Sequence, residues 1–339
     1  MNKKARSAVK PSSAGLPSAA KPVNVGIDVS METLDIGVHE SQEHWTANNE
    51  PGAFPALIKR LKQLKPARIL VEASGGYERV LVLRLSGAGL PVIVVNPAKV
   101  RHFAKAVGKL AKTDRVDAFL LACFGAQLEP VPVPLKPAET QELALLVARR
   151  DQLVEMLGQE QVRLKMARRQ EWPARLVKDL QEHIRELEQR LARCDDDLTH
   201  QLESSPVWRA QDELLQSTPG VGPNVARVLI AHLPELGHAS HRHITGLCGL
   251  APYTRQTGKW VGRSMIGGGR GRVRTALYLA ALVASRHNPV IKALYQRLVA
   301  AGKAKKVALI ACARKLVVLL NAMSRQQTPW QPRLKEDNP

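Results

Sequence analysis

The sequence has few cysteines, and it lacks carboxylates over most of its last third. The cysteines, Cys123, Cys194, Cys248 and Cys312, are widely spaced, with no CxxC pair and no His/Cys cluster. This spacing matches neither a disulfide framework nor a zinc site, so the small secreted and zinc-binding classes are excluded and a reducing cytoplasm is favoured.

Long hydrophobic runs are also missing. The most apolar late segment, VALIACARKLVVLLNAM, is interrupted by Arg314 and Lys315 and is too short to cross a bilayer. Residues 1–22 are basic, rich in Pro, Ser and Ala, and have no long apolar core. They are expected to form a disordered arm rather than a signal peptide, and residues 329–339 a tail. We expect no membrane association.

Positive charge dominates what is present. The chain has 50 Lys and Arg against 30 Asp and Glu, a net charge of +20, and no carboxylate lies between Glu235 and Glu336. A solvated surface normally mixes charges of both signs, so a one-sign block with apolar periodicity predicts a folded nucleic-acid-binding domain rather than a merely basic surface. Its cations include Arg255, Lys259, Arg263, Arg270, Arg272, Arg274, Arg286, Lys303, Lys305 and Lys306.

Residues 23–135 show the pattern of an α/β domain. VNVGIDVS and LDIGV alternate apolar and polar residues and predict a hairpin, and the apolar runs RILVE (68–72) and PVIVV (91–95) predict buried strands between helices. The sheet should therefore be mixed, with the first strands antiparallel and the later ones parallel. The segment EPVPVPLKP (129–137) is typical of a linker that closes the domain.

Residues 136–205 are expected to be helical, with a break near Pro173. Apolar residues recur in alternating steps of four and three, which is a heptad seam: Leu180, Ile184, Leu187, Leu191, Cys194 and Leu198. The pattern fits an antiparallel helical hairpin or a dimerising coiled coil, and a single amphipathic helix packed on a domain remains an alternative.

A compact helical domain is predicted over residues 206–328. In LLQSTPGVGPNVARVLIAHL a helix meets the turn PGVGP and a second helix follows. Gly220 and Gly222 would expose backbone N–H groups at a helix N-terminus, which binds phosphate. The element resembles a helix-hairpin-helix, which contacts the nucleic-acid backbone; a plain helical corner is the alternative.

Four acids have the positions of a metal site. Asp28 lies within the first strand, where a charge is costly unless it is paired or binds metal, and Glu72 ends a buried strand. Asp114 and Asp117 share one helix face. Together these acids would repel unless divalent cations neutralise them, and two Mg²⁺ ions suit such oxygen ligands. Alternatively, Asp114 is an N-cap and Asp117 a first-turn acid. Cations that would hold phosphate lie beside them: Lys109, Lys112 and Arg115.

Several motifs in this order resemble the DEDD transposases, insertion-sequence recombinases related to the pilin-gene invertase. They are GIDVS, VEASGGY, NPAKVRHFAKAVGKLAKTDRVDA, STPGVGP, GLCGLAPYTRQTG and GGGRGRVRTALY. The resemblance implies a RuvC-like, RNase H-type catalytic domain, a coiled coil and a helical transposase domain. It implies that Asp28, Glu72, Asp114 and Asp117 are the DEDD tetrad. It also implies a bridge-type non-coding RNA that pairs with donor and target DNA, and a dimer or tetramer.

The family also uses a serine nucleophile just before a glycine in the C-terminal domain, and the matching residue here is Thr257. Its methyl group crowds the approach to phosphorus, and Ser264 is the nearest other hydroxyl. Because the C-terminal domain is poor in carboxylates, its hydroxyl would have to act with the tetrad of the first domain, in the same chain or a partner. The run Gly267–Gly269 with Arg270, Arg272 and Arg274 is expected to form a flexible phosphate clamp; a solvated basic loop is the alternative.

The function expected is a DNA transposase that cuts and rejoins strands at a magnesium site, acting at the bacterial nucleoid. Two alternatives are a structure-specific, Holliday-junction-type endonuclease, which needs the tetrad but not Thr257, and an inactive nucleic-acid-binding protein. The sequence does not reveal the target site, the RNA guide sequence or the oligomer number.

Overall fold

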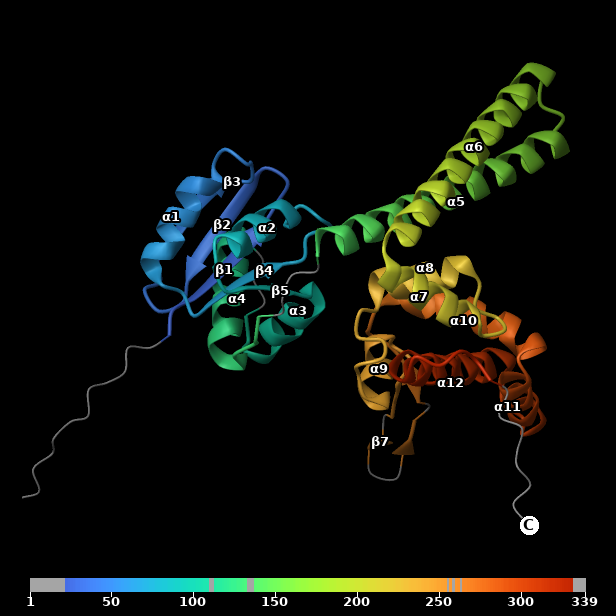
Figure 1. Ribbon diagram of the computed structural model, residues 1–339. Helices are drawn as coiled ribbons and strands as arrows, with labels where there is room; N and C mark the ends of the chain where they lie inside the picture. The colour runs from blue at the N-terminus through green and yellow to red at the C-terminus, as the bar shows by residue number, and fades with distance from the viewer. Residues whose placement is uncertain are drawn as a thin grey trace, which may run out of the picture. The chain divides into compact units, whose positions relative to one another are not determined.

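The computed structural model describes residues 22–109, 113–132, 137–254, 256–257, 260–262 and 264–331 (Figure 1). The chain divides into two compact units, Met1–Leu135 and Lys136–Pro339.

The first unit is built on a mixed five-stranded sheet. Its strands are β1 (Asn24–Val29), β2 (Thr33–Val38), β3 (His44–Asn48), β4 (Arg68–Glu72) and β5 (Val92–Val95), in the order β3-β2-β1-β4-β5. The pairs β1–β2 and β2–β3 are antiparallel, whereas β1–β4 and β4–β5 are parallel. The expected mixed α/β sheet is therefore confirmed. Strand β3 was not predicted, because HWTAN lies at the sheet edge and shows no apolar alternation.

Successive side chains of each strand point to opposite faces of the sheet, and each face packs against a different pair of helices. Val25, Ile27 and Val29 of β1 lie in one buried cluster with residues of α1 (Phe54–Leu64) and α2 (Arg79–Gly87). Leu70 of β4 lies in another with residues of α3 (Pro97–Ala106) and α4 (Asp114–Leu128). The polar residues of β1 share the second face, so helices α3 and α4 cover the side of the sheet that carries the acids.

The second unit begins with two long helices, α5 (Ala138–Arg169) and α6 (Ala174–Ser204), which break at Pro173 as predicted. They form an antiparallel hairpin (Figure 1), and Arg150 of α5 pairs with Asp195 of α6 at 2.7 Å. The heptad residues Ile184, Leu187, Cys194 and Leu198 are buried. The hairpin therefore uses this seam inside one chain.

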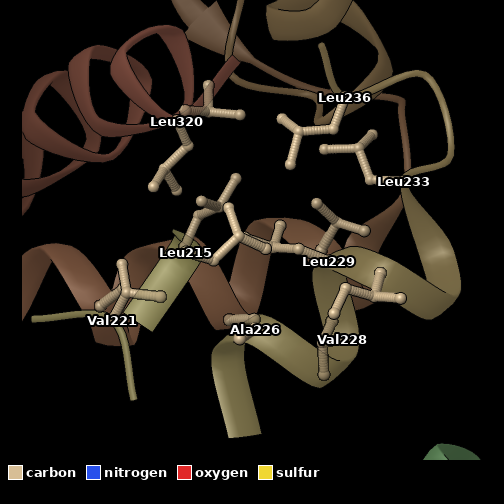
Figure 2. Packing of buried hydrophobic residues seen from close by; sticks show 14 of the residues in the cluster. Leu215, Val221, Ala226, Val228, Leu229, Leu233, Leu236 and Leu320 are labelled. Atoms are coloured by element: carbon tan, nitrogen blue, oxygen red, sulfur yellow. The ribbon is translucent and has the colours of Figure 1, made fainter. Parts of the chain in front are cut away.

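A helical domain follows: α7 (Pro206–Gln216), α8 (Pro223–His232), α9 (His241–Leu247), α10 (Gly271–His287), α11 (Pro289–Ala300) and α12 (Lys305–Gln326). Figure 2 shows part of its core, where Leu320 of α12 lies near Leu215 of α7 and Leu229 of α8. Helix α12 is long and apolar enough to cross a membrane by composition, but 56% of its most apolar window is buried inside the domain. It is therefore explained as a core helix.

Candidate active site

Two glycines bring helix α4 onto the sheet. Gly26 of β1 pairs with Gly37 of β2 in the antiparallel register. A Cβ atom on Gly26 would lie 2.0 Å from the carbonyl oxygen of Ala118, and one on Gly37 would lie 3.1 Å from the amide nitrogen of Phe119. The backbone of α4 therefore lies directly on the strands, at a distance that a side chain at position 26 would prevent.

Asp28 and Glu72 end up next to each other on that face. The parallel register pairs Ile27 with Val71, so Asp28 and Glu72 occupy the next step at the carboxyl ends of β1 and β4. Ile27 and Val71 point into the opposite cluster, which leaves the two acids on the α4 side. Polar groups at the carboxyl ends of parallel strands are the usual place for a ligand site in an α/β sheet.

The first turn of α4 supplies the other two acids. Its N-cap is Thr113, whose Oγ1 accepts a hydrogen bond from Val116 N at 3.3 Å, so the alternative of Asp114 as N-cap is wrong. Asp114 is exposed, whereas Asp117 is 5% exposed. Asp117 precedes Ala118, the residue in contact with Gly26, so the glycine contact also fixes Asp117 near the strand that carries Asp28.

The electrostatics show that the other three acids act on Asp28. Burial, followed by the charges of Glu72, Asp117 and Asp114, raises the pKa of Asp28 from 3.8 to about 6, although the 3.0 Å hydrogen bond from Val29 N opposes the rise. A divalent cation would relieve this repulsion, and carboxylate oxygens are the ligands that Mg²⁺ takes. The donor chemistry fits a magnesium site. In the part of the chain that the structure describes, however, no three acids, histidines or cysteines converge tightly enough to hold one ion.

The predicted nucleophile lies on a small hairpin of the second unit. Strand β6 (Pro252–Tyr253) pairs with β9 (Met265–Ile266), and β7 (Gln256–Thr257) pairs with β8 (Trp260–Val261). Thr257 pairs with Trp260 in the antiparallel register and is exposed, as is Ser264. Both residues therefore lie at the surface of the second unit. Three cations predicted to bind nucleic acid here, Arg255, Lys259 and Arg263, lie outside the described residues, as does Lys112 in the first unit.

The arginines that follow are held by other groups, which changes the clamp hypothesis. Arg270 makes two 2.6 Å hydrogen bonds to the carboxylate of Glu235 and a third to the carbonyl oxygen of His232. Arg272 pairs with Asp151 of α5 at 3.0 Å, and Arg274 donates to the Gly268 carbonyl at 2.6 Å. Arg270 is therefore held in place by Glu235 and is not free to bind phosphate. Glu235 is the last acid before the carboxylate-free stretch.

The glycines of this loop are equally fixed. Gly268 and Gly269 have positive φ values of 63° and 64°. A Cβ atom on Gly269 would lie 2.3 Å from the amide nitrogen of Gly249, so two backbone segments touch at the base of the hairpin. The expected flexible clamp is therefore a braced loop, which presents the hairpin from a rigid base.

The other predicted nucleic-acid contacts fall into two groups. Gly220 (φ 102°) packs on α10, since a Cβ atom there would lie 2.6 Å from Ala284 Cβ, whereas Gly222 is the N-cap of α8 and faces open space. Gly222 therefore suits a phosphate contact better than Gly220 does. The exposed predicted cations in the described ranges are Lys109, Arg115, Arg272, Lys303, Lys305 and Lys306, and of these Arg272 is paired with Asp151.

Comparison with known proteins accounts for both halves of the chain. Residues 25–173 match the IS110 DEDD model described as "Transposase", and residues 212–296 match the model described as "Transposase IS116/IS110/IS902 family". The chain belongs to the IS110 transposase family. The first matched range holds all four acids, and the second holds Thr257.

The transposase is also similar to curated proteins over most of its length. It is 28% identical to the "Pilin gene-inverting protein" of Moraxella bovis and 27% identical to that of Moraxella lacunata, in both cases over 88% of this chain and 94% of the relative. It is 30% identical to "Insertion element IS110 uncharacterized 43.6 kDa protein" of Streptomyces coelicolor, over 39% of this chain and 32% of that protein.

Part of the transposase resembles a solved structure, "T. thermophilus RuvC in complex with Holliday junction substrate". The match covers 32% of this chain and 98% of RuvC, with 17% identity and a TM-score of 0.26.

Sequence reasoning missed several residues around the transposase's acids. Asp35 of β2 pairs in register with Asp28, and its Oδ1 lies 2.9 Å from His44 Nε2. The His44 ring lies 6.1 Å from that of Phe119 on α4. The sequence could have indicated Asp35, because the aspartate of LDIGV lies across the predicted hairpin from Asp28 of GIDVS. No sequence pattern indicated His44, because strand β3 was not predicted.

Proposed function

We propose that this transposase cuts and rejoins DNA strands at a divalent-metal site formed by Asp28, Glu72, Asp114 and Asp117. The observation that supports it best is electrostatic. Glu72, Asp117 and Asp114 all raise the pKa of Asp28, so these three carboxylates lie close enough to Asp28 to repel its charge. A fold gains no stability from such mutual repulsion, which indicates that the acids serve a ligand.

In this proposal the acids bind the cations and nearby basic residues bind the DNA. Asp28 and Glu72 would hold cations from rigid strand ends, and Asp117 from a buried position on α4. The exposed Asp114 would complete the set. Two magnesium ions, when bound, would supply charge neutralisation and Lewis acidity toward the oxygens of a phosphodiester. Arg115, exposed in the first turn of α4 beside Asp114, and the exposed Lys109 would hold the DNA backbone.

Thr257 is assigned the attacking hydroxyl. Its oxygen forms one bond to phosphorus while one P–O bond of the DNA breaks, its proton passes to a base or solvent, and the departing DNA oxygen takes up a proton. The number of phosphodiester-type bonds is then unchanged, so the covalent intermediate can be resealed. Its exposure on a hairpin with a braced base supports this role.

Nucleic-acid partners follow from charge. A net charge of +20 attracts donor and target DNA to the chain, which acts at the nucleoid in this proposal. Lys305 and Lys306 support backbone contact, because two lysines in the first turn of α12 oppose the helix dipole unless an anion lies nearby. A bridge-type RNA guide would select the DNA sequences by base pairing, as the resemblance to the family implies.

Oligomerisation is proposed to use the outer face of the α5–α6 hairpin, since its heptad seam is buried internally. That outer face of α5 carries exposed apolar side chains, among them Leu145, Val162 and Met166. A dimer or tetramer assembled there would bring several acid sites together.

The test is a strand-transfer assay with full-length protein, RNA guide and end-labelled DNA, with Mg²⁺ or EDTA. We expect Asp114→Asn and EDTA to abolish cleavage, and Thr257→Ala to abolish the covalent protein–DNA adduct. Cleavage that survives in Thr257→Ala without an adduct would indicate a nuclease of the junction-resolving type. Unchanged activity of Asp114→Asn would refute the metal site.

A further inference from the structure

A cation of helix α3 contacts the acid cluster formed by Asp28, Glu72, Asp114 and Asp117, and the proposed reaction does not yet use it. Arg101 of α3 forms an ion pair with Asp117, with 3.2 Å between Nη2 and Oδ2. The Asp117 side chain is 7% exposed and the Arg101 side chain 37% exposed. The guanidinium therefore reaches from the surface to a buried carboxylate, and it contacts one of its two oxygens.

Helix α3 presents Arg101 from a fixed position. Val100 and Ala104 are buried against α4, and the Phe103 and Phe124 rings meet edge to face at 5.4 Å. The helix begins at a fixed point as well, because the Asn96 side chain caps it by accepting a hydrogen bond from Ala98 N at 2.8 Å. The ion pair thus joins two helices whose spacing is already set by apolar packing.

Arg101 could affect a bound cation in two opposite ways. Its positive charge would repel the cation, but more than a third of the side chain is exposed and solvent screens the charge. Its hydrogen bond would orient the Asp117 carboxylate, and this effect does not depend on long-range charge. Removing a group that orients a metal ligand typically weakens metal binding by about 10- to 100-fold, so orientation should outweigh repulsion.

We propose that Arg101 is a positioning residue of the acid cluster, which holds Asp117 through Oδ2 and leaves Oδ1 available to a divalent cation. Among the residues that the structure describes, no side chain or backbone group hydrogen-bonds to Oδ1. The inference rests on the proposed function, since it needs the acids to bind metal. It adds that the ligand geometry of Asp117 depends on a residue from another helix.

The experiment measures metal binding rather than activity. Mn²⁺ is titrated into full-length wild-type protein and the Arg101→Ala, Arg101→Lys and Asp117→Asn variants by calorimetry, and the rise in Tm on adding Mg²⁺ is recorded. Lys99→Ala is the matched control, because it removes an exposed cation from the same helix. Circular dichroism checks each variant for folding, and Arg101→Lys provides the comparison if Arg101→Ala does not fold.

We expect Arg101→Ala to bind Mn²⁺ about 10- to 100-fold more weakly than the wild type. Arg101→Lys, which keeps a donor but loses the planar fork, should recover part of the affinity. Lys99→Ala should stay within about threefold of the wild type, because an exposed charge is screened. Equal or tighter binding by Arg101→Ala, with binding lost in Asp117→Asn, would overturn this inference and leave the metal site intact. Absence of Mn²⁺ binding by the wild type would overturn the proposed function and the inference together.

Discussion

Replacing Asp28 with asparagine should stabilise the metal-free protein while removing a ligand. The folded-state pKa of Asp28 is raised from 3.8 to about 6, so the folded chain binds this proton more tightly than the unfolded chain does. Stability therefore falls as pH rises from about 4 to about 6, and the full penalty is present above pH 6. The asparagine side chain in the Asp28→Asn variant carries no charge, so the variant would not incur the penalty.

The magnitude follows from the same shift. A rise from 3.8 to about 6 corresponds to about 3 kcal/mol if taken in full. Asp28 is only partly buried and solvent screens its neighbours, so we expect about 1–2 kcal/mol. For a unit of this size, that is an increase in Tm of about 3–8 °C.

The assay is thermal unfolding of full-length wild-type and Asp28→Asn protein in EDTA, at pH 7.5 and pH 4.5. The variant should unfold at the higher temperature at pH 7.5, and the difference should shrink at pH 4.5, where Asp28 is largely protonated. Adding Mg²⁺ should stabilise only the wild type. Glu32→Gln, which removes an exposed carboxylate nearby, is the control and should change little at either pH. A variant that is less stable than the wild type at pH 7.5, or a gain that does not depend on pH, would refute the reasoning.

Three further outcomes are expected. Gly26→Ala should lower the free energy of unfolding by about 1–3 kcal/mol and weaken Mn²⁺ binding, because the new Cβ atom would displace α4. Gly52→Ala is the control: no atom lies within 4 Å of its new Cβ, so Tm and metal affinity should stay near wild type. Glu235→Gln should lower the urea midpoint by the equivalent of about 1–3 kcal/mol through loss of the charged pair with Arg270; an unchanged midpoint would contradict its bracing role. Thr257→Ser should retain the covalent DNA adduct on a denaturing gel, since serine keeps the hydroxyl without the methyl group, and loss of the adduct would argue against attack from this position.

The fold was predictable where local patterns were strong. The predicted strand at residues 68–72 has the same bounds as β4, because a buried apolar run between turn signals leaves little ambiguity. Helix α1 begins at Phe54, since the preceding Pro51–Gly52 pair forms a turn and Pro55 occupies the first helical turn. The heptads and Pro173 left an antiparallel hairpin and a dimerising coiled coil open, and the structure has the hairpin, with the seam buried within one chain.

The positions of the four acids were also predictable, whereas their ion-pair partners were not. Strand ends and an i, i+3 spacing are local features, so the sequence indicates that Asp28, Glu72 and the two α4 acids share one edge. The pairs Arg101–Asp117 and Arg270–Glu235 depend on how helices pack, which no local pattern encodes. For this reason the run of arginines predicts a phosphate clamp, whereas in the structure Arg270 is bound to Glu235.

The same small residues that pack the first unit also place its chemistry. Gly26 lies two positions from Asp28 on the same strand face, and Ala118 directly follows Asp117 on α4. The contact between Gly26 and Ala118 is therefore made within two residues of Asp28 and of Asp117. Any side chain that widens this contact must also move Asp117 away from Asp28, because neither backbone has a flexible segment between the contact and the acid. Packing at Gly26 and ligand spacing at Asp28 are thus one geometric constraint, because a side chain at position 26 would meet the α4 backbone at Ala118, the residue after Asp117.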